Sequence, residues 1–413
     1  MKHHKVLYIL LISCFHFQCT GQTTKVDGDK TIVSFPRVSV DEPDLPIITG
    51  AAQTDAYIKF LNFKKVGIVA NHTSTINNTH LVDSLVTLGI HIVKVFSPEH
   101  GFRGEADAGE KVASGIDAKT KLPLISLYGN NKKPTPEQLK GIEVMIFDIQ
   151  DVGARFYTYI STMHYVMEAC AENNIRLVIL DRPNPNGHFV DGPILEEKYK
   201  SFVGLHPVPI VHGMTIGEYA QMLNGEKWLK NGVQCTLTII PIKNYTHNTI
   251  YELPIKPSPN LKTMSAVYLY PSLCLFEGTP ISVGRGTEKP FQIIGHPTMK
   301  SDKFTFTPKS MEGAKDPKYK NQLCFGHDLT DYGTIYMRGS KSINLFWLIN
   351  SYKDFPEKEG FFNEMFNLLA GTNQLQMQIK AGKTEEEIKA TWQKGLISFK
   401  SVRKKYLLYK DFE

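Results

Sequence analysis

The sequence predicts an α/β fold, with a mostly parallel sheet covered by helices on both faces and a smaller second domain after it. Short β-branched apolar runs alternate with helical stretches in the first half of the chain. These runs are almost continuously apolar, which is typical of parallel strands buried on both faces. From about residue 252, seven prolines punctuate a stretch with little helical periodicity, so the second domain is expected to begin between residues 245 and 255.

Four strands are expected in this order: Lys65–Ala70, His91–Phe96, Val144–Phe147 and Leu177–Leu180. A helix with Leu81 and Leu85 on one face follows the first strand, and Gly89 marks its end. A second helix, from about Tyr159 to Glu172, leads to the fourth strand. After the proline-rich stretch the pattern is helical again, over Ile343–Ile349, Phe361–Ala370 and Glu385–Phe399, with Thr384 and Glu387 as a capping box for the last.

The composition is that of a globular protein. The 413 residues are 42% hydrophobic and 21% charged, which excludes a disordered, collagen-like or coiled-coil chain and favours two or three domains. The net charge is +6, but residues 1–18 contribute +2 and the last fourteen residues +3, which leaves +1 for the body. A nucleic-acid-binding protein carries a basic stripe on the domain itself, so we expect no nucleic-acid partner.

The first residues have the features of an export signal. Met1–Lys5 is basic and Val6–Phe17 is mostly apolar, which is long enough for a signal peptide and too short to span a bilayer. Cys14 ends a stretch that resembles a bacterial lipobox, and Cys19 ends a poorer match at a more usual distance. We therefore expect an exported, periplasmic lipoprotein with its signal in residues 1–19, a polar tether in residues 20–45, and membrane contact only through a lipid anchor; a plain secreted protein is the alternative.

The other four cysteines are isolated in the sequence, at positions Cys170, Cys235, Cys274 and Cys324. No pair has the spacing of a zinc or redox motif, so we expect them to be small buried side chains.

Polar residues follow all four expected strands. They include Asn71 and His72, Glu99 and His100, Asp148 and Asp151, and Asp181, Arg182 and Asn184. Ligands of open parallel sheets bind beyond the carboxyl ends of the strands, so this edge is the expected site. No GxGxxG or P-loop follows a strand, and there is no HExxH or GxSxG motif. We therefore expect no cofactor and no metal, although the acidic and histidine side chains at these ends, with His212, are an alternative metal-ligand set.

Glu99 is the strongest candidate for acid–base chemistry. It lies at a strand end beside His100 and Arg103, where partial burial would raise its pKa toward the working range and Arg103 would oppose that rise. The alternative is an ion pair between Glu99 and Arg103 that fixes the loop.

The stretch from Asp148 to Tyr159 is the densest in functional groups. Its tyrosines, Tyr157 among them, offer a stacking face for a sugar ring, and Arg155 is suited to bind a ligand carboxylate with two hydrogen bonds. Alternatively, Asp148 and Asp151 hold the turn and cap the helix. The loop after Asp181 is expected to position ligand or neighbouring loops, and His212 either joins this rim or is a structural histidine.

In the second domain, we expect Glu277, Arg285 and Glu288 to close over a ligand from the opposite side of a cleft. The alternative for Glu288 is a surface pair with its neighbour Lys289.

Seven motifs in this order resemble the NamZ-type exo-β-N-acetylmuramidases, formerly a domain of unknown function. They are Gly67–Thr73, Ser97–Gly104, Asp148–Tyr157, Leu180–Pro185, Pro257–Asn260, Leu275–Thr279 and Ser282–Thr287. The resemblance runs from about Val66 to Tyr409, and a set of motifs in order is specific. It implies a Rossmann-like domain, which we place at residues 46–250, and a smaller α+β domain at 251–413, with the site in the cleft between them.

The resemblance also implies hydrolysis that releases N-acetylmuramic acid from the non-reducing ends of peptidoglycan fragments. Glu99 then corresponds to the main catalytic acid/base, and Asp148, Asp151 and Glu288 remain candidates for its partner, since glycoside hydrolysis usually needs two carboxyl groups. The expected substrate-binding residues are Asn71, His72, His100, Arg103, Arg155, Tyr157, Asp181, Arg182, Asn184, Asn260, Glu277 and Arg285. Muramic acid carries a lactyl carboxylate, so we expect one arginine of the cleft, Arg155, Arg182 or Arg285, to bind it.

Two other classes of function remain open at this point. One is a non-catalytic muropeptide-binding lipoprotein that delivers its ligand to a transporter. The other is a metal-dependent hydrolase that acts on the peptide or acyl groups of the cell wall.

Overall fold

The computed structural model describes residues 45–99, 101–103, 114–299 and 303–413. The expected signal, both candidate anchor cysteines, residues 20–44 of the tether and His100 lie outside the described residues. Pro46–Glu413 form one compact unit, so the expected boundary at residues 250 and 251 stays a prediction.

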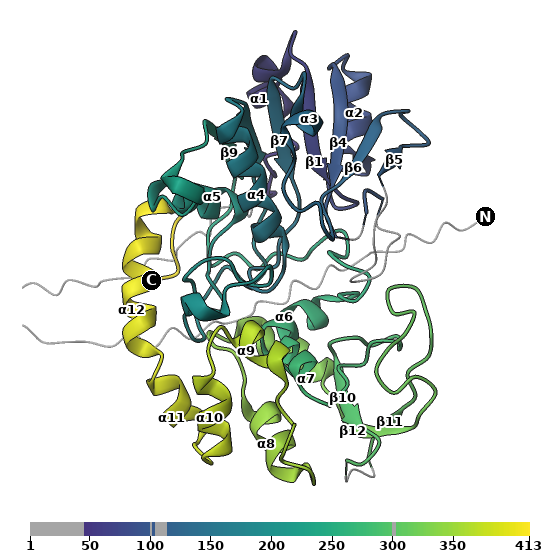
Figure 1. The fold of residues 1–413 in the computed structure, drawn as a ribbon, viewed down its shortest axis with the longest axis vertical. Coiled ribbons are helices and arrows are strands. Elements are labelled where there is room, and N and C mark those ends of the chain that lie inside the picture. The colour runs from purple at the N-terminus through teal and green to yellow at the C-terminus, as the bar shows by residue number, and fades with distance from the viewer. Residues whose placement is uncertain (1–44, 100, 104–113, 300–302) are drawn as a thin grey trace, which may run out of the picture. The chain divides into compact units, whose positions relative to one another are not determined.

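A seven-stranded sheet forms the centre of the first part, in the order β5-β6-β4-β1-β7-β8-β9 (Figure 1). Its strands are β1 (Val66–Ala70), β4 (Ile92–Ser97), β5 (Gly115–Ile116), β6 (Pro123–Ser126), β7 (Val144–Asp148), β8 (Arg176–Leu180) and β9 (Leu237–Ile240). All neighbours are parallel except β5 and β6. The four expected strands are therefore confirmed, and they are the four adjacent central strands β4, β1, β7 and β8.

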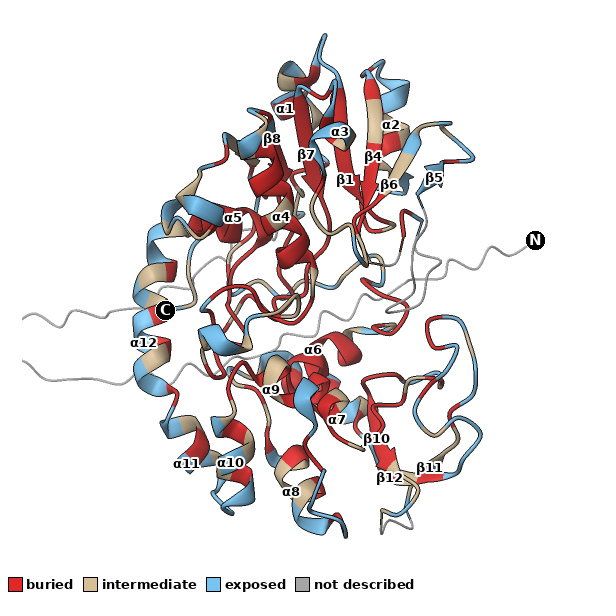
Figure 2. Cartoon of the chain, in the orientation of Figure 1, coloured by how far each residue is buried: buried red, intermediate tan, exposed pale blue. Residues whose placement is uncertain are grey.

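Helices cover this sheet, and each strand contributes alternate side chains to two hydrophobic cores. Ile68 and Ile146 belong to one core, while Val69 and Phe147 belong to the other. The covering helices are α1 (Thr54–Leu61), α2 (Leu81–Thr87), α4 (Tyr159–Glu172) and α5 (Ile216–Gly225). Figure 2 shows β1 and β7, at the centre of the sheet, buried along their length. Burial on both faces explains why these strands are apolar without alternation.

The second part combines a small antiparallel sheet with helices. The sheet has the order β10-β12-β11, and its strands are β10 (Ile293–His296), β11 (Thr305–Phe306) and β12 (Cys324–Asp328). The longer helices are α6 (Met264–Leu273), α8 (Phe346–Asp354), α9 (Glu364–Ala370), α10 (Gln374–Lys380) and α12 (Gln393–Arg403). The expected α+β character of this region is confirmed.

Two local predictions were wrong. The stretch expected to be loop contains α6, which is buried on every side and so lacks the polar face that makes a helix visible in a sequence. The expected helix Glu385–Phe399 is two helices, α11 (Glu385–Ala390) and α12, which meet near Trp392. The capping box at its start is confirmed, since Thr384 Oγ1 accepts the Glu387 N–H at 3.2 Å and Glu387 accepts the Thr384 N–H at 2.8 Å.

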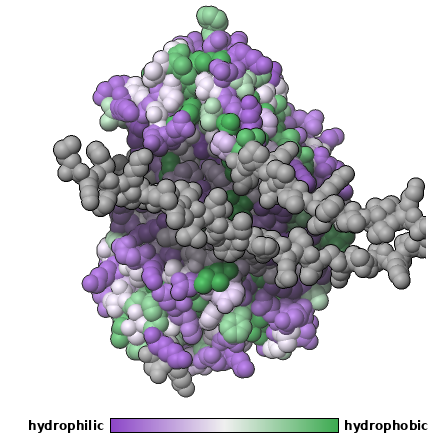
Figure 3. Space-filling view, turned by 180° about the vertical axis from the view of Figure 1, so that it is seen from behind, coloured by the Kyte–Doolittle hydropathy of each residue, from purple (hydrophilic) through white to green (hydrophobic). Residues whose placement is uncertain are grey.

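The four cysteines expected to be buried are free and buried, as predicted. Among the described residues, no helix is both long and apolar enough to cross a membrane. On the face that Figure 3 presents, hydrophilic and hydrophobic residues are interspersed outside the grey atoms.

Candidate active site

A pocket of about 330 Å³ lies at the carboxyl edge of the sheet, and both parts of the chain contribute to its wall. Residues 99 and 156–159 follow strands β4 and β7, while the remaining wall comes largely from the second part of the chain. The lining residues are Glu99, Phe156, Tyr157, Thr158, Tyr159, Val203, Ser258, Asn260, Leu261, Tyr270, Cys274, Glu277, Arg285, Phe291, Met365 and Leu369. Of the expected site residues, the structure thus brings together Glu99, Tyr157, Asn260, Glu277 and Arg285.

Glu99 is held by residues that follow the neighbouring strands. Thr158 Oγ1 donates a hydrogen bond to Glu99 Oε2 at 2.8 Å, and the Tyr159 hydroxyl lies 3.4 Å from the Glu99 carbonyl oxygen. Tyr159 in turn accepts a hydrogen bond from Asn71 Nδ2 at 2.9 Å. Because β1, β4 and β7 are adjacent and parallel, these three strand ends meet at one edge. The expected convergence at the carboxyl ends is confirmed for these residues.

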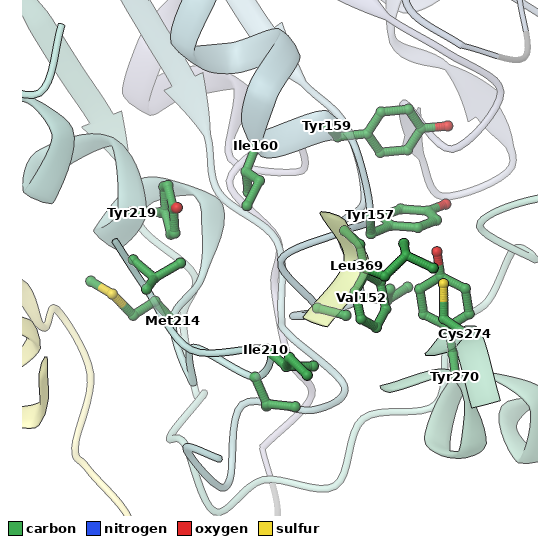
Figure 4. Packing of buried hydrophobic residues seen from close by; sticks show 14 of the residues in the cluster. Val152, Tyr157, Tyr159, Ile160, Ile210, Met214, Tyr219, Tyr270, Cys274 and Leu369 are labelled. Atoms are coloured by element: carbon green, nitrogen blue, oxygen red, sulfur yellow. The ribbon is translucent and has the colours of Figure 1, made fainter. Parts of the chain in front are cut away.

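The aromatic wall of the pocket is made by tyrosines from both parts of the chain. Tyr157 packs edge-on against Tyr159 and Tyr270, with ring centroids 4.9 and 5.9 Å apart. Figure 4 shows Tyr157, Tyr270, Cys274 and Leu369 gathered at this point although they come from different elements. Burial raises the pKa of Tyr157 and Tyr270 well above the ordinary value, so both remain neutral phenols. The tyrosines therefore line the pocket, and the stacking of a sugar on them stays a prediction.

Glu277 and Arg285, which line the pocket from the second part of the chain, form an ion pair. Arg285 Nε lies 2.7 Å from Glu277 Oε1 and Nη2 lies 3.1 Å from Oε2, so the pair is bidentate. Their side chains are 30% and 25% exposed, which leaves both accessible to a ligand. Burial alone would raise the pKa of Glu277, but the charge and hydrogen bonds of Arg285 outweigh it and lower the pKa.

Gly278, the residue after Glu277, must be glycine because a Cβ there would lie 2.4 Å from the backbone of Phe366 in α9. Since no other residue allows this approach, the turn that carries Glu277 packs directly on α9.

Asp148 and Arg182 form a buried ion pair with each other and do not line the pocket. Arg182 donates from Nε and Nη2 to the two oxygens of Asp148, at 2.6 and 2.8 Å, and Asp148 has no exposed surface. Neither side chain is part of the pocket lining. This buried ion pair joins the ends of β7 and β8. Asp148 therefore has the structural role that the sequence analysis gave as the alternative to catalysis.

Asp181 and Asn184 are also buried, and their side chains form hydrogen bonds within the protein. Asp181 accepts hydrogen bonds from Thr215, Tyr409 and the Gly217 N–H at 2.6–2.9 Å, and so ties α5 and the C-terminal segment to the end of β8. Asn184 donates to the Met214 carbonyl at 2.9 Å. These contacts agree with the expectation that this loop positions its neighbours.

Arg155 does not reach the pocket. Its guanidinium is fully buried and donates to the carbonyls of Pro193, Val208 and Leu369 at 2.7–2.9 Å. The expectation that Arg155 grips a ligand carboxylate is therefore corrected: it joins three chain segments behind the pocket.

Three further candidates lie away from the pocket lining. Arg103 holds Asp117 with two hydrogen bonds, at 3.1 and 2.9 Å. His72 Nε2 lies 2.9 Å from the Lys256 carbonyl, and Glu288 is 81% exposed and pairs with Lys262 at 2.9 Å. Glu288 is a surface residue, as its alternative stated, although its partner is Lys262 and not Lys289.

Several lining residues were not predicted from the sequence. Thr158 and Tyr159 belong to the dense stretch after β7, so a wider selection there would have included them. Val203, Met365 and Leu369 are ordinary apolar residues in the sequence, and no local pattern distinguishes them. In the part of the chain that the structure describes, no three His, Cys, Asp or Glu side chains are grouped so that they could hold a metal ion.

Asp151 and His212 form a buried polar pair behind the pocket, with Asp151 Oδ2 and His212 Nε2 3.9 Å apart. Asp151 Oδ2 accepts the Gly153 N–H at 2.6 Å, and Oδ1 has no hydrogen-bond partner among the described residues. Burial raises the pKa of Asp151 to about 7 and lowers that of His212 to about 3. Both side chains are thus neutral in mildly acidic solution, and His212 is a structural histidine.

We expect Asp151 to make the protein less stable as the pH rises from 5 to 8. Its pKa is higher in the folded than in the unfolded state, so the stabilising contribution of the bound proton is present at low pH and is lost as the pH rises through about 7. From pH 5 to pH 8 the loss is on the order of 2–3 kcal/mol, because only about two pH units of this range lie below the folded-state pKa. Urea unfolding of the wild type and Asp151→Asn at pH 5 and pH 8 measures it. At pH 8 the free energy of unfolding of the variant should rise relative to that of the wild type. The same difference in free energy of unfolding between the two proteins at pH 5 and pH 8 would contradict the assignment.

The chain matches a known family over most of its length. Residues 66–265 match the family described as exo-beta-N-acetylmuramidase NamZ, N-terminal, and residues 268–409 match its C-terminal counterpart. The peptidoglycan beta-N-acetylmuramidase NamZ of Bacillus subtilis (strain 168) is 41% identical over 375 residues, which cover 86% of this chain and 89% of that protein.

Two crystal structures of proteins of the DUF1343 family from Bacteroides fragilis NCTC 9343 have the same fold. One, at 1.30 Å resolution, is 50% identical, with a TM-score of 0.83 over 89% of this chain and 100% of the other. The second, at 1.65 Å, is 30% identical, with a TM-score of 0.76 over 88% and 99% of the two chains. These matches show that the chain belongs to the NamZ family of exo-β-N-acetylmuramidases.

Proposed function

We propose that this protein is an exo-acting glycoside hydrolase that releases N-acetylmuramic acid from the non-reducing ends of peptidoglycan fragments. The observation that carries the proposal is a pocket that combines Glu99, a tyrosine wall and the Glu277–Arg285 pair in a chain of the NamZ family. The relative from Bacillus subtilis is named a peptidoglycan beta-N-acetylmuramidase, and its similarity extends over nearly all of the two-part fold.

The size of the pocket supports exo action. About 330 Å³ is at the lower end of the range of roughly 300–1,000 Å³ for small-molecule sites, so the pocket is suited to one terminal sugar rather than to a long glycan.

Glu99 is the proposed acid/base. Its Oε2 accepts the Thr158 hydroxyl at 2.8 Å, which fixes the orientation of the carboxyl group at the pocket. In the first step the protonated Glu99 donates its proton to the glycosidic oxygen as the bond from the anomeric carbon to that oxygen breaks. In hydrolysis the resulting carboxylate takes a proton from the attacking water.

Arg285 is the proposed receptor for the lactyl carboxylate. Of the three arginines considered, Arg155 and Arg182 are bound inside the protein, while Arg285 lines the pocket. Its Nε and Nη2 donate to Glu277, and Nη1 has no hydrogen-bond partner within the described part of the chain, so Nη1 is the proposed donor to the lactyl carboxylate. Guanidinium–carboxylate hydrogen bonds are among the stronger ones in proteins, so this contact would distinguish muramic acid from glucosamine.

We expect Arg285→Ala to lose preference for the muramyl sugar. Free N-acetylmuramic acid and N-acetylglucosamine differ only in the lactyl group, so their inhibition constants form a matched pair. The variant should bind N-acetylmuramic acid about 10- to 100-fold more weakly, the equivalent of one charged hydrogen bond, and N-acetylglucosamine almost unchanged. Equal losses for both sugars would show that Arg285 acts only through Glu277.

The activity itself is tested with a chromogenic N-acetylmuramide, with and without EDTA. We expect release of the chromophore that EDTA does not affect, and release of N-acetylmuramic acid from the non-reducing end of a muramyl disaccharide. Binding without release would favour the muropeptide-binding protein, and loss of activity with EDTA would favour the metal-dependent hydrolase.

We also propose that the protein is exported to the periplasm and anchored to a membrane by a lipid on Cys14 or Cys19. The support is the basic and apolar pattern of residues 1–17 and the polar composition of residues 20–45. Metabolic labelling with a fatty-acid analogue in a bacterial host tests this, with Cys14→Ala and Cys19→Ala compared with the full-length wild type. One of the two variants should lose the label, and an unlabelled wild type would refute the anchor.

A further inference from the structure

We infer that Glu277 is the second catalytic carboxylate, the nucleophile that attacks the anomeric carbon while Glu99 protonates the leaving oxygen. This inference rests on the proposed glycosidase function and adds to it a residue expected from the sequence only to bind substrate. The alternatives for this role were Asp148, Asp151 and Glu288.

None of those three alternatives lines the pocket. Among the described residues, Glu99 and Glu277 are the acidic side chains that line it. Asp148 is fully buried against Arg182, and Asp151 is buried behind the wall with Gly153 as its hydrogen-bond donor. Glu288 is 81% exposed on the surface. A nucleophile must touch the sugar, and of these four only Glu277 lies where a sugar in the pocket would be.

Arg285 keeps the Glu277 carboxylate ionised. Its two hydrogen bonds, at 2.7 and 3.1 Å, occupy one side of both oxygens and would be lost in part if the carboxyl took a proton. Consistent with this geometry, Arg285 lowers the pKa of Glu277 against the opposite effect of burial. An ionised, weakly basic carboxylate is suited to attack carbon and later to leave. It is less suited to take a proton from water, which is the task of the second carboxylate in an inverting enzyme.

The backbone around Glu277 is held from several sides. Lys318 Nζ donates to the carbonyls of Glu277 and Thr279, at 3.2 and 2.6 Å, and Gly278 packs on the backbone of Phe366. The Tyr319 hydroxyl donates to the Pro280 carbonyl at 2.6 Å. A backbone fixed in this way holds the Glu277 carboxylate near one position, which reduces the entropy cost of reaching the geometry for attack.

The proposed reaction has two displacements. In the first, a Glu277 oxygen forms a bond to the anomeric carbon, the bond from that carbon to the leaving oxygen breaks, and the leaving oxygen takes the proton of Glu99. In the second, Glu99 removes a proton from water, the water oxygen bonds to the same carbon, and the bond to Glu277 breaks. The sugar is released with its original β configuration, and both carboxyl groups return to their initial protonation states.

The test compares Glu277→Ala with its matched control Glu99→Ala on an aryl N-acetylmuramide, with sodium azide as an external nucleophile. Glu277→Ala should lower kcat at least about 10³-fold. Azide should then restore turnover and give the α-glycosyl azide, because it enters from the side that Glu277 has vacated. Glu99→Ala with azide should give the β-glycosyl azide, since there azide attacks the intermediate carried by Glu277. The wild type should release the β anomer first, as seen by proton NMR.

The outcomes separate this inference from the proposed function. If the wild type cleaves the muramide but releases the α anomer, Glu277 is not the nucleophile. The same conclusion follows if Glu277→Ala keeps more than about a tenth of wild-type kcat. A wild type that does not cleave the muramide refutes the glycosidase function instead. Glu277→Gln, which keeps a hydrogen-bond acceptor for Arg285, controls for folding: it should unfold at the wild-type temperature and still bind N-acetylmuramic acid while remaining inactive.

Discussion

Replacement of Glu99 by Gln is expected to lower kcat on an aryl N-acetylmuramide about 10²- to 10⁴-fold, the range for a positioned general acid. Gln has nearly the same shape, and its amide oxygen still accepts the hydrogen bond from Thr158. Binding of N-acetylmuramic acid should therefore change little. What the amide cannot do is donate a proton at the leaving oxygen and recover it from water.

The leaving group provides an internal check on this role. A phenol that is more acidic needs less help from a proton, so the loss in Glu99→Gln should shrink for the first step as the acidity of the phenol increases. Glu288→Gln is the matched control, because this carboxylate is 81% exposed and lies outside the pocket lining. It should keep wild-type activity. A Glu99→Gln variant with wild-type kcat would remove Glu99 from the mechanism.

The second large effect is on stability. Asp148→Asn is expected to lower the free energy of unfolding by about 3–5 kcal/mol, because it leaves the Arg182 guanidinium, which is 5% exposed, without its buried counter-charge. Asn is close to Asp in volume, so no cavity accounts for the loss. Urea unfolding at neutral pH, with the slope compared between proteins, measures the effect.

Two controls make this prediction specific. The exposed pair of Glu288 and Lys262 is of the kind that contributes at most about 1 kcal/mol, so Glu288→Gln should unfold close to the wild type. The double variant Asp148→Asn with Arg182→Met removes both charges and should recover part of the loss. If Asp148→Asn cost no more than Glu288→Gln, the buried pair would not be what holds the ends of β7 and β8.

The central sheet was predictable from the sequence because a parallel strand buried on both faces is a local pattern. The four runs that became β1, β4, β7 and β8 are each short, apolar and bounded by polar residues. Parallel neighbours place their carboxyl ends at one edge, so the position of Glu99 followed without knowledge of packing. Helix α6 was missed for the complementary reason, since a helix buried all round has no periodic signal.

The sequence by itself therefore determined the α/β class, the sheet edge at which the pocket lies and Glu99 as the leading acid/base candidate. Only the tertiary structure decided which of the other charged residues face the same pocket. The sequence left Asp148, Asp151 and Glu288 as candidates for the second carboxylate and Glu277 as a substrate-binding residue, and it did not choose between Arg155, Arg182 and Arg285 for the lactyl carboxylate. Packing separates them, because a charge that is neutralised inside the protein, as Asp148 is by Arg182, cannot also meet a ligand. Glu277 and Arg285 are separated by only seven residues, but nothing local to them indicates that the fold carries them to Glu99, which lies far away in the chain.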